Sequence, residues 1–261
     1  MNSFEGKVAL ITGAGSGIGK ATALLLAKHG VKVGVLNRGQ KSANYVQSEI
    51  EKAGGEALAL AADISQPEVM QHAVEKLVSR YGRLDIVFAN AGINGVLNTI
   101  EDLEVEDWKD TVNINLTGTF ITVKYAIPYL KKQGGSIVIT SSVNGNRIFS
   151  NFGFSAYSTT KAGQVALMKM AALELSTYGI RVNAICPGAI TTNIGENTDK
   201  RPEIEEVRIP IVFPEGDQPL AHKPGSSEQV AQLVKFLVSD DSNHITGTEI
   251  YIDGAESLIR G

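Results

Sequence analysis

The stretch VALITGAGSGIGK, from Val8 to Lys20, joins a short apolar run to a turn with four glycines. The β-branched run predicts a buried strand, and the residues from Gly17 onward predict the start of a helix. Glycines at such a junction let the backbone approach a ligand, and the free N–H groups of the helix attract phosphates. The spacing fits neither G-x-x-x-x-G-K-[ST] nor G-x-G-x-x-G. By itself the stretch predicts a phosphate site, with a turn that binds nothing as the alternative.

Short β-branched runs alternate with longer amphipathic segments along most of the chain. The runs predict strands at 7–12, 31–36, 57–61, 84–89, 136–140, 181–186 and 249–252. The segments between them predict helices at 18–29, 40–53, 67–81, 108–131, 156–178 and 227–238. This alternation is typical of an α/β fold whose parallel strands are joined by right-handed crossovers. We therefore expect a doubly wound, mainly parallel Rossmann-type sheet of about seven strands, with helices on both faces and ligands at the carboxyl ends of the strands.

The segment from about 191 to 224 interrupts the alternation. It has no clear period, and five prolines lie between Pro202 and Pro224. A long loop inside a domain is typical of a lid or binding loop, or else of disorder. Since no repeat or linker divides the remaining sequence, we expect one domain over 1–261 with a substrate lid at about 191–224.

Composition narrows the class of protein. The net charge is −4 and no basic stripe is present, so a nucleic-acid partner is not expected. The N-terminus has no leader pattern and no apolar run has membrane-spanning length, so no membrane partner is expected either. The chain has one cysteine, Cys186, and its four histidines lack metal-ligand spacing. These features predict a cytoplasmic protein without a metal site.

The end of the second predicted strand bears on the choice of cofactor. In dinucleotide folds an acidic side chain at this point bonds the ribose hydroxyls. Here the position holds Asn37, followed by Arg38. Asparagine does not repel a 2′-phosphate, and arginine can pair with it. The pair favours NADP(H) over NAD(H), although Arg38 taken alone could equally be a solvated surface residue.

Tyr157 and Lys161 are spaced four residues apart at the start of a predicted helix, which places them on one face. A lysine ammonium beside a phenol lowers the pKa of the tyrosine, which makes Tyr157 a candidate acid or base for a carbonyl or alcohol. Ser141 and Ser142 end the preceding strand, where a hydroxyl can hold the substrate oxygen. A lone Tyr-x-x-x-Lys is often a surface pair, but the two serines favour a catalytic role.

Together these motifs resemble the short-chain dehydrogenase/reductase family in its single-domain form. TGAGSGIG (12–19) is similar to the glycine motif of that family, and ANAG (89–92) to the turn after its fourth strand. NINLTG (113–118) contains its helix asparagine, CPGAITT (186–192) its Pro-Gly motif, and ITGTEIYIDGA (245–255) its last strand. The resemblance runs from Gly6 to about Gly254, and it rests on the number and order of the motifs.

The resemblance implies hydride transfer between a nicotinamide cofactor and a carbonyl or secondary alcohol of a small molecule. It implies that Tyr157 exchanges the substrate proton, Lys161 lowers its pKa, Ser142 polarises the carbonyl and Asn115 holds a water that links Lys161 to solvent. Together with the reasoning above, it gives the cofactor-binding residues as Gly13, Ser16, Gly17, Ile18, Gly19, Asn37, Arg38, Asp63, Ile64, Asn90, Ala91, Gly92, Tyr157, Lys161, Pro187, Gly188, Ile190 and Thr192.

Some features of the sequence allow more than one interpretation. The spacing from Ser142 to Tyr157 is longer than the family pattern, which indicates a small insertion and leaves Ser141 as an alternative to Ser142. The insertion carries Phe149, Phe152 and Phe154, which either line an apolar substrate pocket or pack against another loop or subunit. A nucleotide-sensing regulator and a cofactor-retaining epimerase are alternative functions. By resemblance the chain is expected to form a homo-oligomer, either a dimer or a tetramer.

Overall fold

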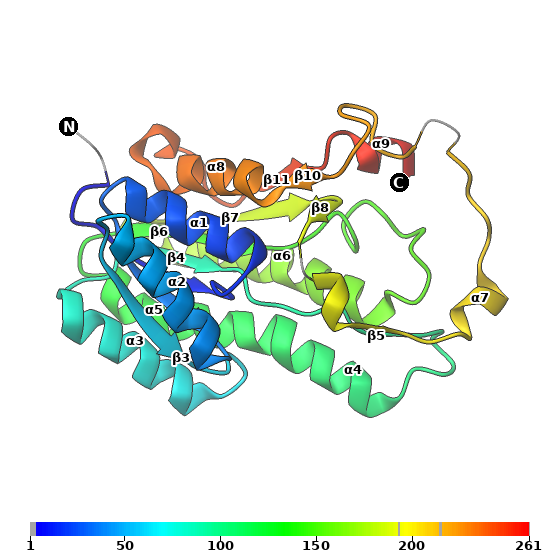
Figure 1. Ribbon diagram of the computed structural model, residues 1–261, viewed down its shortest axis with the longest axis horizontal. Coiled ribbons are helices and arrows are strands. Elements are labelled where there is room, and N and C mark those ends of the chain that lie inside the picture. Colours follow the sequence, from blue (N-terminus) through cyan, green and yellow to red (C-terminus); the bar gives the residue numbers. More distant parts are fainter. Residues whose placement is uncertain (1–3, 193, 214–215, 261) are drawn as a thin grey trace.

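A seven-stranded parallel sheet forms the centre of the computed structural model, which describes residues 4–192, 194–213 and 216–260 (Figure 1). The strand order is β11-β7-β6-β4-β1-β2-β3, and every neighbouring pair is parallel. The strands are β1 Val8–Thr12, β2 Lys32–Asn37, β3 Ala57–Ala61, β4 Ile86–Ala89, β6 Gly135–Thr140, β7 Ile180–Pro187 and β11 Glu249–Ile252. The predicted doubly wound sheet is confirmed.

Strand β1 lies at the point where the strand order reverses. It pairs with β2 on one side and β4 on the other, so Ala9 is opposite both Val33 and Ile86. The chain runs outward from β1 to β3, then returns to β4 and continues to the other edge. In such sheets a crevice opens above the carboxyl ends of the two strands at this reversal. The residues that follow Thr12 and Ala89 therefore lie where a ligand is expected.

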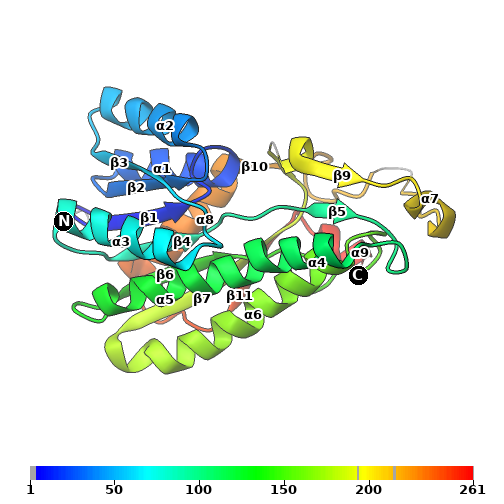
Figure 2. The same ribbon diagram turned by 90° about the horizontal axis from the view of Figure 1, so that it is seen from below.

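Helices cover both faces of the sheet (Figures 1 and 2). One layer contains α1 Gly17–Lys28, α2 Gln40–Lys52 and α8 Ser227–Val238, and the other contains α3 Pro67–Tyr81, α5 Gly118–Leu130 and α6 Ser155–Leu175. Successive strand residues enter opposite cores: Leu10 belongs to the cluster under α3, α5 and α6, whereas Ile11 belongs to the one under α1, α2 and α8. Both faces are buried, which explains the unbroken apolar strands.

The predicted helix at 108–131 is a longer helical path with an irregular turn inside it. It begins with α4 Val105–Val112, passes through a π-helical turn at Asn113–Thr117 and continues as α5. A single π turn is a local change from i→i+4 to i→i+5 hydrogen bonding, which a pattern of apolar residues read over a whole helix does not resolve. As a result Asn115 is completely buried on the side of the π-helical turn that faces α6.

The predicted lid contains short elements that connect it to the rest of the fold. Strand β8 Ile190–Thr191 pairs with β10 Gly225–Ser226, and β9 Thr198–Lys200 pairs with β5 Gly95–Leu97. Helix α7 Ile204–Val207 lies between β9 and β10 in the chain. Helix α9 Glu256–Arg260 follows the last strand, β11. Figure 1 shows this segment beyond the carboxyl ends of the strands. Of the predicted lid at 191–224, residues 193, 214 and 215 lie outside the described residues.

Among the described residues, no helix combines the length and the apolar character needed to cross a lipid bilayer.

Candidate active site

The glycine turn after β1 places backbone without side chains at the crevice. Gly13 and Gly17 adopt positive φ angles of 66° and 51°, which side chains rarely permit. A Cβ on Gly19 would lie 2.3 Å from the carbonyl oxygen of Gly13, so α1 packs against the end of β1 with no room for a side chain. Gly19 itself does not line the cavity described below. It is the residue that lets the turn close.

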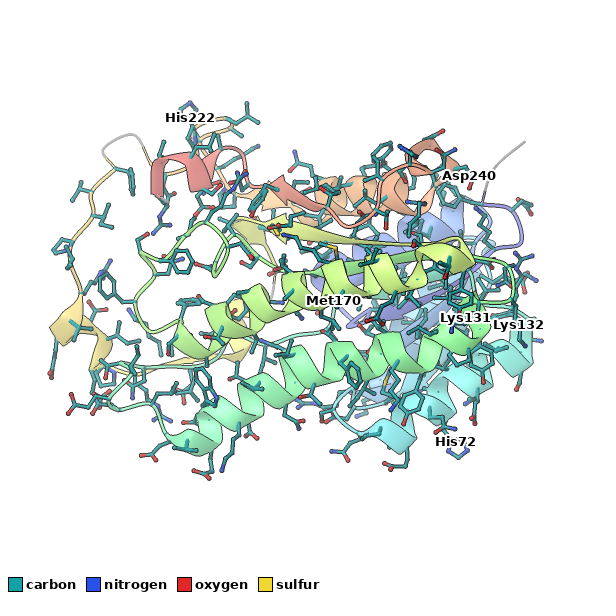
Figure 3. The ribbon with its side chains drawn as sticks, turned by 180° about the vertical axis from the view of Figure 1, so that it is seen from behind. His72, Lys131, Lys132, Met170, His222 and Asp240 are labelled. Atoms are coloured by element: carbon teal, nitrogen blue, oxygen red, sulfur yellow. The ribbon has the colours of Figure 1, made fainter. Side chains whose placement is uncertain are left out.

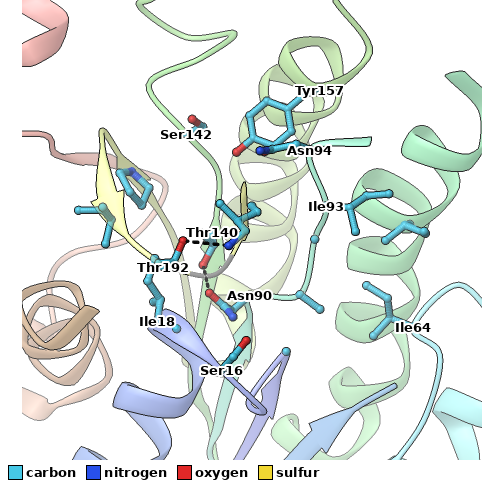
Figure 4. Close-up of a pocket in the computed structure, with 18 of the residues that line it drawn as sticks. Ser16, Ile18, Ile64, Asn90, Ile93, Asn94, Thr140, Ser142, Tyr157 and Thr192 are labelled. Atoms are coloured by element: carbon cyan, nitrogen blue, oxygen red, sulfur yellow. Dashed lines mark hydrogen bonds between the residues drawn. The ribbon is translucent and has the colours of Figure 1, made fainter. Parts of the chain in front are cut away.

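Asn90 joins the two central strands to β6 just below the cavity. Its backbone N–H donates to Thr12 Oγ1 over 3.0 Å and its Nδ2 donates to the Thr12 carbonyl over 3.2 Å. Its Oδ1 accepts a hydrogen bond of 3.1 Å from Thr140 Oγ1 (Figure 4). These bonds fix the positions of the strand ends from which the cavity is built.

A cavity of about 990 Å³ opens above the carboxyl ends of the strands. In Figure 4 Ser16 and Ile18 of the glycine turn lie at one end and Ser142 and Tyr157 at the other. Of the residues predicted for the site, all but Gly19 and Asn115 line it: Gly13, Ser16, Gly17, Ile18, Asn37, Arg38, Asp63, Ile64, Asn90, Ala91, Gly92, Ser142, Tyr157, Lys161, Pro187, Gly188, Ile190 and Thr192.

The two serines at the end of β6 have different partners. Ser142 lines the cavity near Tyr157 and acts to lower the pKa of that phenol, and its hydroxyl oxygen accepts from the backbone N–H of Asn144 over 3.1 Å. The Ser141 hydroxyl instead donates to the backbone carbonyl of Lys161 over 2.8 Å and accepts from Asn146 Nδ2 over 3.0 Å. Ser141 therefore anchors α6 to the strand, and the geometry favours Ser142 as the hydroxyl that faces a substrate oxygen.

Burial dominates the protonation of the two candidate reactive groups. It raises the pKa of Tyr157 to about 12, against a smaller lowering by Ser142. It lowers the pKa of Lys161 to about 8. The expected lowering of the tyrosine pKa by the ammonium is therefore not found: Lys161 Nζ lies 5.3 Å from the ring centroid, and loss of solvation sets the direction of the shift. At neutral pH Tyr157 carries its proton and is able to donate it.

Lys161 is held from the protein side by neutral groups. Its Nζ donates to the Thr140 carbonyl over 2.8 Å and to Gln164 Oε1 over 3.1 Å. Asn115, by contrast, does not reach it: the Asn115 side chain bonds both the N–H and the carbonyl of Ile93, over 2.9 and 2.8 Å. Asn115 thus fixes the loop after β4. Gln164 was missed by the sequence analysis, although its spacing of three residues from Lys161 was a usable signal.

The opposite end of the cavity is lined by polar groups from the ends of β2 and β3. Arg38 is exposed and lies beside Asn37, Gly39 and Ser42 in the lining. Ser42, in the first turn of α2, was not among the predicted residues. Asp63 uses one carboxylate oxygen to accept hydrogen bonds from Ser65, which turns the chain after β3. Asp63 is the one acidic residue among the described residues that line this end. Position 37 holds an asparagine rather than an acidic residue.

The reactive end of the cavity has further walls that the sequence analysis did not predict. Asn94 and Asn144 line it, as does Ile194 from the segment after β8. Of the three phenylalanines in the insertion, Phe154 lines the cavity, whereas Phe149 is 75% exposed outside it and Phe152 is absent from its lining. Of the two roles left open for these residues, pocket lining fits Phe154 and not Phe149, because the loop turns Phe149 outward.

These observations fit a dinucleotide. The cavity is large, its floor is glycine backbone at the start of α1, and it lies at the reversal point of a parallel sheet. Within the described part of the chain, no three His, Cys, Asp or Glu side chains gather as metal ligands would. The single cysteine, Cys186, is fully buried in β7, and burial raises the pKa of its thiol to about 11.

Comparison with known proteins agrees with this geometry. A family model described as "Enoyl-(Acyl carrier protein) reductase" matches residues 13–255. Cyclohexanol dehydrogenase of Acinetobacter sp. (strain SE19) is 43% identical over 255 residues, which cover 97% of this chain and 96% of that protein. The chain belongs to the short-chain dehydrogenase/reductase family.

Solved structures of short-chain dehydrogenases/reductases share the fold over nearly the whole chain. A 3-ketoacyl-ACP reductase from Sinorhizobium meliloti 1021 is 53% identical, with a TM-score of 0.94 over 97% of this chain and 100% of that one. A 3-ketoacyl-(acyl-carrier-protein) reductase from Brucella melitensis, complexed with NADH, is 33% identical, with a TM-score of 0.85 over 98% and 100%. The chain is accordingly an oxidoreductase that transfers hydride between a nicotinamide cofactor and a carbonyl or alcohol substrate.

Proposed function

We propose that this short-chain dehydrogenase/reductase is an NADP(H)-preferring carbonyl reductase or alcohol dehydrogenase in which Tyr157 is the proton donor and acceptor. The observation that carries the proposal is one cavity with Ser142, Tyr157 and Lys161 at one end and an exposed Arg38 at the other. When bound, the nicotinamide donates or accepts the hydride. The residues of the chain align the substrate and move its proton.

Each of the three reactive-end residues has a distinct role in this proposal. The Ser142 hydroxyl orients the substrate oxygen next to the Tyr157 phenol, with which it shares one end of the cavity. Tyr157 donates its proton to the carbonyl oxygen in reduction and takes it back from the alcohol in oxidation. The Lys161 ammonium favours the phenolate that remains when the proton has left. Asn115 supports the site from behind by fixing the loop at Ile93.

The reaction is tested by following the absorbance of the reduced nicotinamide with a panel of ketones, aldehydes and secondary alcohols. Turnover with at least one substrate class, faster with NADPH than with NADH, supports the proposal. Tight cofactor binding without turnover across the panel would favour the nucleotide-sensing alternative instead.

The preference for NADP(H) rests on the groups around the end of β2. Asn37 occupies the position where a carboxylate would repel a 2′-phosphate, and Arg38 and Ser42 supply a positive charge and a hydroxyl beside it. The amino end of α2 starts in the same place, at Gln40, and contributes partial positive charge. The relative from Brucella melitensis was solved with NADH, so NAD(H) is the alternative that the next experiment separates.

Arg38→Ala should weaken NADPH binding by about 1.5–3 kcal/mol, roughly 10- to 150-fold, because it removes one charge-assisted hydrogen bond. NADH binding should change by less than about twofold. Both dissociation constants can be measured by fluorescence titration. Lys41→Ala is the matched control, since it removes the same charge from a neighbouring exposed residue that does not line the cavity. Equal weakening of both cofactors by Arg38→Ala would remove the basis for the NADP(H) preference.

The rate of carbonyl reduction should be level near neutral pH and decline above about pH 8. Burial lowers the pKa of Lys161 to about 8, so the ammonium is present below that pH and lost above it. Tyr157, with its pKa raised to about 12, keeps the proton it must donate over the same range. The profile of kcat/KM from about pH 6 to 10 measures this directly. A profile that stays level to pH 10 would show that the lysine charge is not needed.

We also propose a homo-oligomer and a single catalytic domain in the cytoplasm. The outer faces of α5 and α6 expose Phe120, Met170 and Leu173, and Figure 3 shows these two helices side by side with Met170 on the outer face of α6. Exposed apolar side chains on these two helices support pairing with a second copy. The one cysteine is a free thiol, as in proteins of a reducing compartment. Light scattering of the purified chain tests the assembly.

A further inference from the structure

Gln164 lies on the protein side of Lys161, on the next turn of α6, and its side chain is 1% exposed. Its Oε1 accepts the hydrogen bond from Lys161 Nζ at 3.1 Å. Its Nε2 donates to the Asn115 carbonyl at 2.7 Å and to Thr119 Oγ1 at 2.8 Å. One buried carboxamide thus links the ammonium of α6 to the π-helical turn.

The orientation of this carboxamide is fixed by its two acceptors. Thr119 Oγ1 itself donates to the Asn115 carbonyl over 2.7 Å, so both groups that face Nε2 accept hydrogen bonds. A reversed amide would set its oxygen against these oxygens and its N–H against the ammonium. The negative end of the amide dipole is therefore held against Lys161.

The surroundings of Lys161 offer it no negative charge at neutral pH. The titratable groups that face it are Tyr157 on α6 and Cys186 on β7, and burial raises the pKa of these to about 12 and about 11. The facing groups of β6 and the π-helical turn, Thr140 and Asn115, are neutral. Within the described part of the chain, the hydrogen bonds of Nζ go to the Thr140 carbonyl and Gln164. Gln164 is the side chain that solvates the buried ammonium.

We propose that Gln164 is a positioning residue that keeps Lys161 charged and aims its remaining N–H at the cavity. This inference rests on the proposed function, in which that ammonium faces Tyr157. A neutral amide stabilises the ammonium without the full charge of a carboxylate, which would draw the ammonium away from the phenol. The carboxamide also connects the Lys161 ammonium to the Asn115 carbonyl through two hydrogen bonds, of 3.1 and 2.7 Å.

Gln164→Met tests the inference because methionine has similar length and no strong acceptor. We expect the titration midpoint of Lys161, followed by NMR of its labelled Cε in the cofactor-free chain, to fall by about one unit. The decline of carbonyl reduction at alkaline pH should move down by the same amount. At about pH 9 kcat then falls about tenfold, while KM stays within about twofold.

Gln164→Glu should move both midpoints in the opposite direction, since a carboxylate beside the ammonium favours its charged form. This second variant decides the matter if the methionine variant does not fold. Gln133→Met is the matched control: the Gln133 amide donates to the Leu84 carbonyl, away from the cavity, and both midpoints should stay unchanged.

Unchanged Lys161 midpoints in both Gln164 variants would overturn the inference and reduce Gln164 to a packing role. Lack of turnover by the unmodified chain would overturn the proposed function instead. The NMR midpoints do not depend on turnover, so they still decide whether Gln164 sets the charge of Lys161.

Discussion

Tyr157→Phe should lower kcat for carbonyl reduction by about 10²- to 10⁴-fold and leave the affinity for NADPH within about twofold. The substitution removes one hydroxyl from a ring that stays buried in an edge-on contact with Phe154, 5.7 Å between centroids. The proton that Tyr157 holds at neutral pH is then missing, while the cavity keeps its shape. Initial rates from nicotinamide absorbance and a fluorescence titration of NADPH measure the two effects separately.

Tyr178→Phe is the control for this substitution, because Tyr178 is half-exposed and does not line the cavity. It should keep full activity. Near-normal turnover by Tyr157→Phe would mean that another group supplies the proton, and Ser142 would be the next one to test. Loss of NADPH affinity together with turnover would indicate that the ring, rather than the hydroxyl, had been disturbed.

Gly19→Ala should destabilise the fold by about 3 kcal/mol and weaken NADPH binding at least about tenfold. The added Cβ meets the Gly13 carbonyl oxygen at 2.3 Å and Asn90 Nδ2 at 2.8 Å. The carbonyl belongs to the backbone of the turn and cannot rotate away, so α1 must shift from the end of β1. That shift widens the turn on which the cofactor phosphates are expected. Urea unfolding with an unchanged m value measures the first effect and NADPH titration the second.

Gly163→Ala is the matched control within another helix. Its Cβ would meet only the flexible end of Leu116, at 3.1 Å, and alanine is the better helix former by about 1 kcal/mol. This variant should be as stable as the original chain or slightly more so. Equal destabilisation at both positions would mean that the close approach of α1 to Gly13 does not set the geometry of the turn.

The strands, the main helices and most of the cavity lining follow from sequence because they depend on local patterns. The predicted β-branched runs end within about one residue of the ends of the observed strands. The residues directly after β1, β2, β4 and β6 meet in one cavity. The family resemblance added Pro187, Gly188, Ile190 and Thr192 to the predicted cavity lining. No helix or strand periodicity in the sequence pointed to these residues. The strand pattern of a parallel sheet is thus enough to predict which strand ends meet in the cavity. The roles of the residues that line it stay predictions that the variants above test.

Other features depend on three-dimensional surroundings and were not predictable in this way. The π-helical turn is a local change that the apolar pattern does not resolve, so nothing in the sequence marked the complete burial of Asn115. The pKa of Tyr157 is governed by lost solvation, which a spacing of four residues to Lys161 does not report. The partner of Lys161 became visible only when α6 was packed on the turn that carries Asn115 and Thr119.

The buried thiol of Cys186 gives this chain a native probe of its own opening. It is the only cysteine in the sequence, and it lies in β7 between β6 and β11 with no exposed surface. Thiolate is the reactive form, and burial raises the pKa of the thiol to about 11, so an external disulfide reagent reacts only when a local or global opening exposes Cys186. The labelling rate therefore counts opening events without any introduced residue. A nucleotide that binds only the closed state slows labelling by the factor 1 + [L]/Kd, where [L] is the free nucleotide concentration. The dissociation constant of the nucleotide therefore follows from the labelling rate.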